Sequence, residues 1–207
     1  MFGKMNNFMS NPRYNQILAT AKVLFWKHGF KRVTVEEICR ESGVSKMTFY
    51  KFFRNKKEVA KAVYDMVVEK GYEDFKAIMD DKDTPPRQKM EQILILKLEG
   101  TNDISREFLT DFYSNPEFGL SEYIEQKTRE IWVNVIGDFK KAQEKGWLRK
   151  DFKPEGIFLF INRLFDIFED ESAAELYDSP QELVMELSRF FTYGIMPREN
   201  SDNGSAG

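Results

Sequence analysis

The 207-residue sequence predicts an all-α protein. Apolar residues recur at intervals of three and four almost everywhere, while the alternation that marks strands is nearly absent. The composition, 42% hydrophobic and 31% charged, is ordinary for a chain that folds around an apolar core. No internal repeat or long low-complexity segment interrupts the helical pattern.

The first predicted helix runs over about residues 12–28 and ends at Gly29, followed by a short basic link over 30–33. Thr34-Val-Glu-Glu37 has the form of a capping box, in which a Thr hydroxyl accepts a hydrogen bond from the amide three residues on. This motif predicts a second, short helix that ends near Glu41.

A turn at residues 42–44 separates that helix from the next one, which Ser45 caps and which continues to about Phe53. Asn55 with Glu58 three residues later is another start signal. We expect a long helix from there toward Met79.

The strongest helix breaker in the chain, residues 80–86 (DDKDTPP), follows this long helix. Helices are predicted at about 87–100, 105–114, 116–145, 154–171 and 180–194. Proline suits the first turn of the last three, and Gly146 suits the end of the longest. The expected domains are a flexible N-terminus at 1–11, a helix-turn-helix domain at 12–57, a helical body at 58–196 and a disordered tail at 197–207.

Charge is distributed unevenly along the chain, whose net charge is -3. Residues 1–60 contain 12 Lys and Arg against four Glu, a net charge of +8, and the remaining 147 residues contain 19 Lys and Arg against 30 Asp and Glu, a net charge of -11. A basic head on an acidic body is typical of a protein that binds a polyanion, although a merely solvated surface would look similar.

Cys39 is the single cysteine, so no intrachain disulfide and no cysteine-type zinc site are expected. The N-terminal residues lack an apolar signal segment, and the apolar runs are too short to span a membrane. We expect a cytoplasmic protein that does not bind membranes.

Two short helices joined by a Gly-containing turn have the geometry of a helix-turn-helix, whose second helix enters the major groove of double-stranded DNA. The apolar residues Val35, Ile38, Cys39, Val44 and Phe49 can form a small core with the first helix, which leaves the outer face of the second helix free. By pattern alone, an ordinary helical hairpin is equally compatible. Polar and basic groups on the outer face and at the helix starts predict base and phosphate contacts by Thr34, Ser45, Lys46, Met47, Thr48, Tyr50, Lys51 and Lys56.

The run TVEEICRESGVSKMTFYKFFRNKKEV (residues 34–59) resembles the DNA-binding signature of TetR-type (TetR/AcrR) transcriptional regulators. The resemblance covers about residues 13–60, and Met47 and Phe52 depart from it where Gly and His are frequent. It implies a dimeric, ligand-responsive regulator, most often a repressor, in which Thr48, Tyr50 and Lys56 contact DNA and Thr34 binds phosphate.

The segment from residue 157 to 168 is apolar around most of a helix, so more than one surface must cover it. A second copy of the chain is the expected cover, with a helix central to a monomeric core as the alternative. A homodimer would present two recognition helices to an approximately palindromic operator. The predicted interface residues are Phe160, Leu164, Phe168, Val184, Leu187 and Phe191.

The body is rich in aromatic residues, and a helical bundle can leave an apolar cavity among them. Most aromatics at helical spacing are core residues, so a cavity is an expectation drawn from the resemblance, which implies a pocket for a small-molecule effector. The predicted lining is Phe75, Phe108, Phe112, Tyr113, Phe118, Trp132, Ile136 and Phe139.

The main alternative is an enzyme with a helical body, and a second is a protein whose basic head binds an acidic partner or a membrane surface. His28 sits at a helix end, and Cys39 falls on the buried side of the motif. Neither forms part of a catalytic constellation, so the sequence predicts no catalytic residue, no metal site and no cofactor.

Overall fold

The computed structural model describes residues 10–159 and 176–197. Within these ranges every regular element is helical, which confirms the all-α prediction. Residues 154–159 are also helical. The elements are α2 (Pro12–Arg32), α3 (Val35–Glu41), α4 (Lys46–Phe52), α5 (Lys56–Asp80), α6 (Pro86–Gly100), α7 (Arg106–Leu109), the π-helix η1 (Thr110–Ser114), the 3-10 helix η2 (Pro116–Phe118), α8 (Ser121–Glu144) and α11 (Pro180–Ile195).

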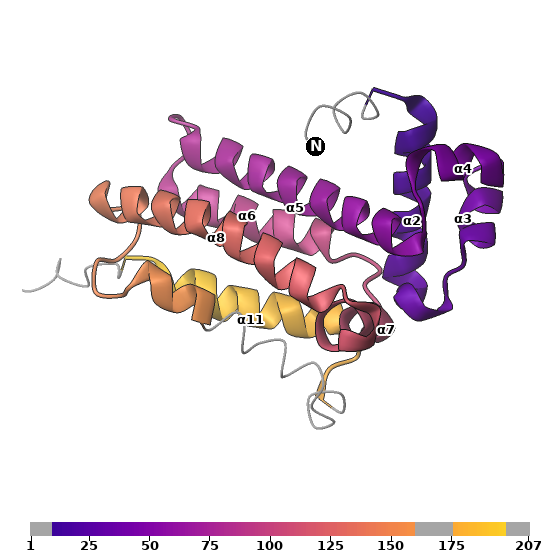
Figure 1. The fold of residues 1–207 in the computed structure, drawn as a ribbon. Coiled ribbons are helices and arrows are strands. Elements are labelled where there is room, and N and C mark those ends of the chain that lie inside the picture. The colour runs from indigo at the N-terminus through magenta and orange to yellow at the C-terminus, as the bar shows by residue number, and fades with distance from the viewer. Residues whose placement is uncertain (1–9, 160–175, 198–207) are drawn as a thin grey trace, which may run out of the picture.

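The helices form a small head and an elongated body (Figure 1). Helices α2, α3 and α4 make up the head at one end, while α5, α6, α8 and α11 run roughly lengthwise through the body. Helix α7 lies where α2 meets the body, and both α5 and α7 pack against α2. The short helices α3 and α4 are therefore attached to the body through α2 and the start of α5.

The three predicted capping residues at the starts of α3, α4 and α5 all accept the expected hydrogen bond. The side-chain oxygens of Thr34, Ser45 and Asn55 accept from the amides of Glu37, Thr48 and Glu58 at 3.1, 3.1 and 3.0 Å. Each bond satisfies one of the orphan donors of a helix start, typically worth about 1 kcal/mol. The starts of α3, α4 and α5 are thus fixed locally by the residues that predict them.

Two helix boundaries differ from the prediction. Helix α2 resumes after Gly29, which breaks it with a backbone φ of 74°, and continues to Arg32 where a non-helical link is expected. The single helix predicted over 116–145 is instead η2 followed by α8, because Gly119 adopts φ 57° between them. Gly146, with φ 74°, follows the end of α8, as predicted. The helix expected over 154–171 is described only as far as residue 159.

Buried side chains fall into two clusters. The junction cluster joins the head to the near end of the body, and the distal cluster fills the far end of the body between α5, α6, α8 and α11. The junction cluster includes Phe25, Trp26, Phe30, Ile38, Cys39, Val44, Phe49, Phe53, Val59, Val63, Tyr64, Phe108, Leu109 and Phe112. The distal cluster includes Phe75, Met79, Met90, Val135, Phe139, Ala142, Leu148, Ile157 and Ile195.

Candidate nucleic-acid interface

The inner sides of α3 and α4 are held together by the predicted small core. Ile38, Cys39 and Phe49 are buried in the junction cluster, and the amide of Val44 donates to the carbonyl of Cys39 at 3.0 Å. Gly43 takes φ 65°, a left-handed conformation that favours glycine, and so makes the turn between the two helices. Because burial fixes one side of α4, the other side must face away from the protein.

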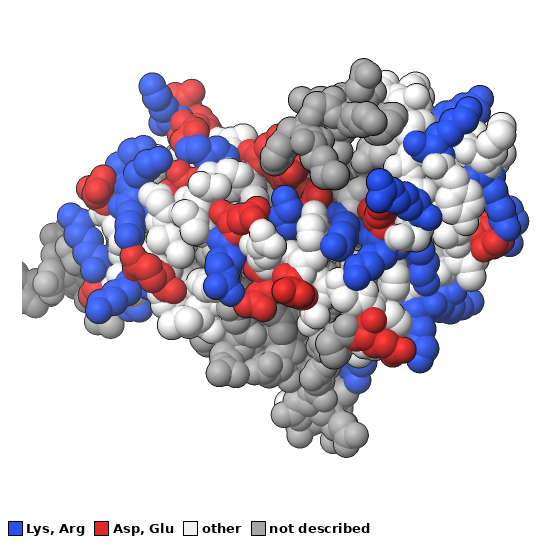
Figure 2. All heavy atoms as spheres, in the orientation of Figure 1, with Lys and Arg blue, Asp and Glu red and all other residues white. Residues whose placement is uncertain are grey.

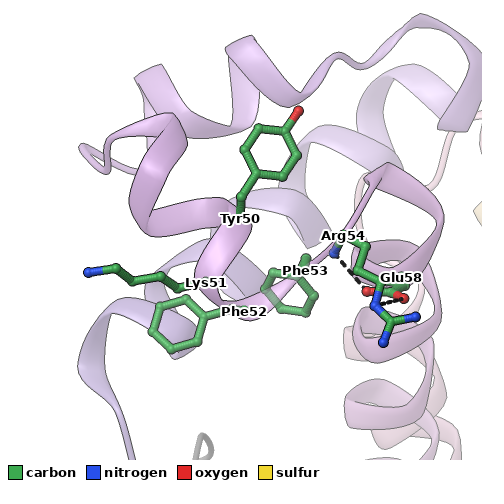
Figure 3. A pocket seen from close by; sticks show the side chains of 6 residues that line it. All are labelled: Tyr50, Lys51, Phe52, Phe53, Arg54 and Glu58. Carbon is green, nitrogen blue, oxygen red and sulfur yellow. Dashed lines mark hydrogen bonds and ion pairs between the residues drawn. The ribbon is translucent and has the colours of Figure 1, made fainter.

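The outer face of α4 carries Met47, Tyr50 and Lys51. Tyr50 and Lys51 come three and four residues after Met47, the spacing at which side chains are neighbours on a helix. Met47 is 71% exposed and Tyr50 54% exposed, and Lys51 is also exposed. Figure 3 shows the Tyr50 ring and the Lys51 side chain extending from α4 in different directions. The prediction that these three side chains lie on the surface is confirmed.

Lys46 is exposed and forms an ion pair with Glu36 of α3. Its hydrogen bond to the Glu36 carboxylate raises the pKa of Lys46 and lowers that of Glu36. Exposed pairs of this kind contribute little to stability, because water and salt screen their charges. The contact turns the Lys46 ammonium group toward α3.

Thr48 does not face outward as the sequence predicts. It is 8% exposed, and its hydroxyl lies 2.9 Å from the Ser45 hydroxyl, which also accepts from the Thr48 amide. The contact between the two hydroxyls directs the Thr48 side chain toward the start of the helix. Ser45 and Thr34 remain exposed at their helix starts, so the phosphate contacts expected of them stay predictions.

Lys56 is turned inward, toward the end of α2. Its ammonium nitrogen donates to the carbonyls of Phe30 at 2.6 Å, Val33 at 2.7 Å and Lys31 at 3.3 Å, and lies 4.2 Å from the centre of the Phe30 ring. Burial lowers the pKa of Lys56, and the charge of Asp111 partly opposes that shift. All three donors of this ammonium have carbonyl partners, so the phosphate contact predicted for Lys56 would compete with them and stays a prediction.

A shallow pocket of about 410 Å³ opens between the end of α4 and the start of α5 (Figure 3). Tyr50, Lys51, Phe52, Phe53, Arg54 and Glu58 line it. The Arg54 side chain is 86% exposed, while its amide donates to the Glu58 carboxylate at 2.7 Å. The sequence-based prediction leaves Arg54 out of the site, yet Arg54 lines the same pocket as Tyr50 and Lys51.

The surface of the head is rich in basic side chains. Figure 2 shows Lys and Arg gathered at the end of the molecule formed by α2, α3 and α4, whereas basic and acidic side chains alternate over the body. Among the exposed basic residues of the head are Lys31, Arg32, Arg40, Lys46, Lys51 and Arg54. The excess of basic residues in the N-terminal sequence therefore becomes a basic surface on the head, around α4.

Polar contacts join the head to the body at the C-terminal half of α2. The Asp111 carboxylate, from η1, accepts from the amide of Lys31 at 2.7 Å, and the Ser105 amide donates to the carbonyl of Trp26 at 2.9 Å. The Trp26 and Phe108 rings lie 4.2 Å apart, centre to centre. The position of the head is consequently tied to the conformation of α7 and η1.

The residues predicted to line an effector pocket are divided between the two buried clusters. Phe108 and Phe112 are buried in the junction cluster with Tyr113 and Phe118 packed against it, while Phe75, Phe139 and Trp132 belong to the distal cluster. Ile136 is half-buried on α8. The structure thus does not bring the predicted lining together, and a cavity among these residues stays a prediction.

Trp26, which the sequence-based prediction leaves out, adds a polar group to the junction cluster. Its indole nitrogen is buried and has no hydrogen-bond partner in the part of the chain that the structure describes. A buried donor without an acceptor is uncommon in folded proteins. The tryptophan occurs in a strongly apolar stretch, so its sequence context predicts a core residue and nothing more.

The predicted dimer residues are described in part. On α11, Val184, Leu187 and Phe191 are half-buried, and Phe191 packs against the distal cluster. Phe160, Leu164 and Phe168 lie outside the described residues. Two aromatics that the prediction omits, Phe190 and Tyr193, are 67% and 57% exposed on α11.

Within residues 10–159 and 176–197, no three His, Cys, Asp or Glu side chains are grouped so that they could hold a metal ion. Nor does any helix in these ranges have the length and apolar character required to cross a membrane.

Residues 17–63 match the family model described as bacterial regulatory proteins, tetR family. The matched segment contains α3, α4 and the turn between them, the elements that present Met47, Tyr50 and Lys51. This N-terminal segment is thus of the tetR type. The sequence-based resemblance is thereby confirmed.

A curated relative with similarity in the same part of the chain is the Transposon Tn10 TetC protein of Escherichia coli, 34% identical over 61 residues. That similarity spans 30% of this chain and 30% of the length of TetC. Among solved structures, the regulatory protein TetR from Rhodobacter sphaeroides has a TM-score of 0.67 at 16% identity, covering 89% of this chain and 99% of that one. The fatty acid degradation regulator FadR from Bacillus halodurans has a TM-score of 0.66 at 16% identity, covering 91% and 99%. At 16% identity, these two structures share with this chain the fold of head and body.

Proposed function

We propose that this protein is a non-enzymatic, sequence-specific DNA-binding regulator of transcription, and that it acts as a repressor. The observation that carries the proposal is α4: a capped helix with a buried inner side, whose outer face of Met47, Tyr50 and Lys51 is free to enter a major groove. The basic surface around it supplies the sequence-independent attraction to phosphate. Thr34 and Ser45, exposed at helix starts, are placed to contact the backbone on either side.

We expect the active species to be a homodimer on an approximately palindromic operator. A single seven-residue recognition helix offers few base contacts, and two copies about 34 Å apart would meet successive major grooves. The exposed aromatics Phe190 and Tyr193 on α11 support an interface on that helix, since large apolar side chains in one area commonly mark a contact surface.

We further expect a small-molecule effector to release the DNA by acting at the junction cluster. Its aromatic rings and the Trp26 indole N–H, which has no partner among the described residues, suit an apolar molecule with one hydrogen-bond acceptor. A molecule bound there would bias the position of α7 and η1, and through the Asp111–Lys31 contact the position of the head.

Selection of bound duplexes from a random pool with the purified full chain tests this function. A regulator of this kind enriches one approximately palindromic sequence, and Lys51→Ala weakens binding to it. Lys150→Ala, which removes an exposed lysine from the body, is the matched control and leaves binding unchanged. A pool that stays random after repeated rounds, with the wild-type protein folded, refutes sequence-specific recognition.

A further inference from the structure

The polar side chains at the N-terminal half of α4 are directed away from its outer face. The Thr48 hydroxyl is buried beside the Ser45 hydroxyl at 2.9 Å, and the Lys46 ammonium is turned toward Glu36 on α3. These three residues include every conventional hydrogen-bonding side chain of the cap and first turn, a region that in helix-turn-helix proteins contacts base edges. In this structure, the first turn of α4 therefore directs neither the Thr48 hydroxyl nor the Lys46 ammonium toward a base edge.

Met47 is the side chain that this arrangement leaves facing outward. It is 71% exposed, the largest exposed fraction among the large apolar side chains of the head, and it belongs to neither buried cluster. The Tyr50 ring, one turn further on, is 54% exposed beside it. Together the two form an apolar ridge on a helix that is otherwise surrounded by basic groups.

Base edges in the major groove offer one apolar group, the C5-methyl of thymine. A methionine side chain has no donor and a weak acceptor, so it gains little from the polar edges of guanine, cytosine or adenine. Its flexible thioether can instead cover a methyl group at slightly different positions. We infer that Met47 is a specificity-determining residue that reads a thymine methyl group in each operator half-site, with the Tyr50 ring flanking the same contact.

This inference rests on the proposed function and adds to it the chemistry of the preferred base. Lys51 and Arg54 lie further along the chain, at the pocket beyond Tyr50, where they are placed for phosphate or guanine. The expected half-site therefore contains thymine where the start of α4 meets the groove. Loss of one buried methyl group corresponds to about a fourfold loss of affinity.

The test replaces thymine by deoxyuridine, one position at a time, in the duplex enriched from the random pool, which deletes the C5-methyl and keeps all pairing groups. The wild-type protein should lose affinity about fourfold at one thymine per half-site. Met47→Ala should bind the thymine and uracil duplexes equally, whereas Met47→Leu, which stays apolar, should still distinguish them. Val133→Ala, which shortens an exposed aliphatic residue on α8 in the body, is the control and should discriminate as the wild type does.

Two results overturn the inference while leaving the proposed function intact. One is an enriched duplex in which no thymine-to-uracil change weakens binding; the other is equal discrimination by the wild type and Met47→Ala at every thymine. If no duplex is enriched at all, the proposed function is refuted, and the inference, which rests on it, is refuted too. Circular dichroism of Met47→Ala, an exposed position, should match the wild type and so separate lost recognition from lost folding.

Discussion

Gly29→Ala should strongly destabilise the protein for two reasons. The backbone conformation of Gly29 is unfavourable for L-residues, and neighbouring atoms occupy the space that a Cβ atom would need. Gly29 has φ 74° and ψ 171°, a conformation that costs other residues about 1–3 kcal/mol. A Cβ atom at this position would lie 2.6 Å from a carboxylate oxygen of Asp111 and 3.0 Å from the carbonyl oxygen of Glu107. Asp111 would have to move, and with it the hydrogen bond that it accepts from Lys31.

The lost hydrogen bond to a charged group adds about 1.5–3 kcal/mol, so the free energy of unfolding should fall by about 2.5–6 kcal/mol. Urea titration followed by circular dichroism measures this. Gly71→Ala is the matched control: this glycine lies inside α5 with open space around it, and alanine there should be neutral or stabilise by up to about 1 kcal/mol. If Gly29→Ala changes the free energy of unfolding by less than about 0.5 kcal/mol, the packing of the head on η1 described above is wrong.

Three further predictions concern other parts of the head and body. Lys56→Met should lower the free energy of unfolding by about 1–3 kcal/mol, because the carbonyls of Phe30 and Val33 lose their charged donor; unchanged urea stability would mean that those bonds are dispensable. Thr34→Ala should cost about 1 kcal/mol through loss of the α3 cap, and Thr34→Ser should restore it; equal stability of the two variants would contradict the capping role. Burial is the main cause that raises the pKa of both Tyr113 and Tyr123 above the unfolded value of about 10. Their contribution is therefore complete below about pH 10 and is lost as the pH rises further, so urea midpoints should fall as the pH is raised above about 10, and less steeply in Tyr123→Phe; identical slopes in the two proteins would exclude Tyr123 as a source.

The parts of the fold that the sequence predicts well are those decided within a few residues. Thr34, Ser45 and Asn55 cap their helices by bonding to amides three positions on, so local sequence suffices to place the starts of α3, α4 and α5. Gly43 makes its turn through its own backbone freedom. The small core of the helix-turn-helix follows from helical spacing for the same reason.

The parts that it predicts poorly depend on contacts between distant residues. Lys56 is one of several lysines near the start of α5, and its inward orientation depends on the carbonyls of residues 30–33, which the fold brings to it. Spacing alone also cannot divide the aromatics of the body between the junction and distal clusters, because that division follows from how α7 and η1 pack on α2. Gly119 shows a different limit: a glycine within a long helical pattern is compatible with either a continuous helix or the break that occurs.

The most direct test of the central claim, that the outer face of α4 recognises DNA, is the ratio of dissociation constants for the enriched duplex and a scrambled duplex of the same composition at one salt concentration. The wild-type protein should prefer the enriched duplex by about a thousandfold or more, and Tyr50→Ala should lose much of that preference while keeping its affinity for the scrambled duplex. A ratio near one for the wild type, or an unchanged ratio in Tyr50→Ala, would contradict recognition through this face.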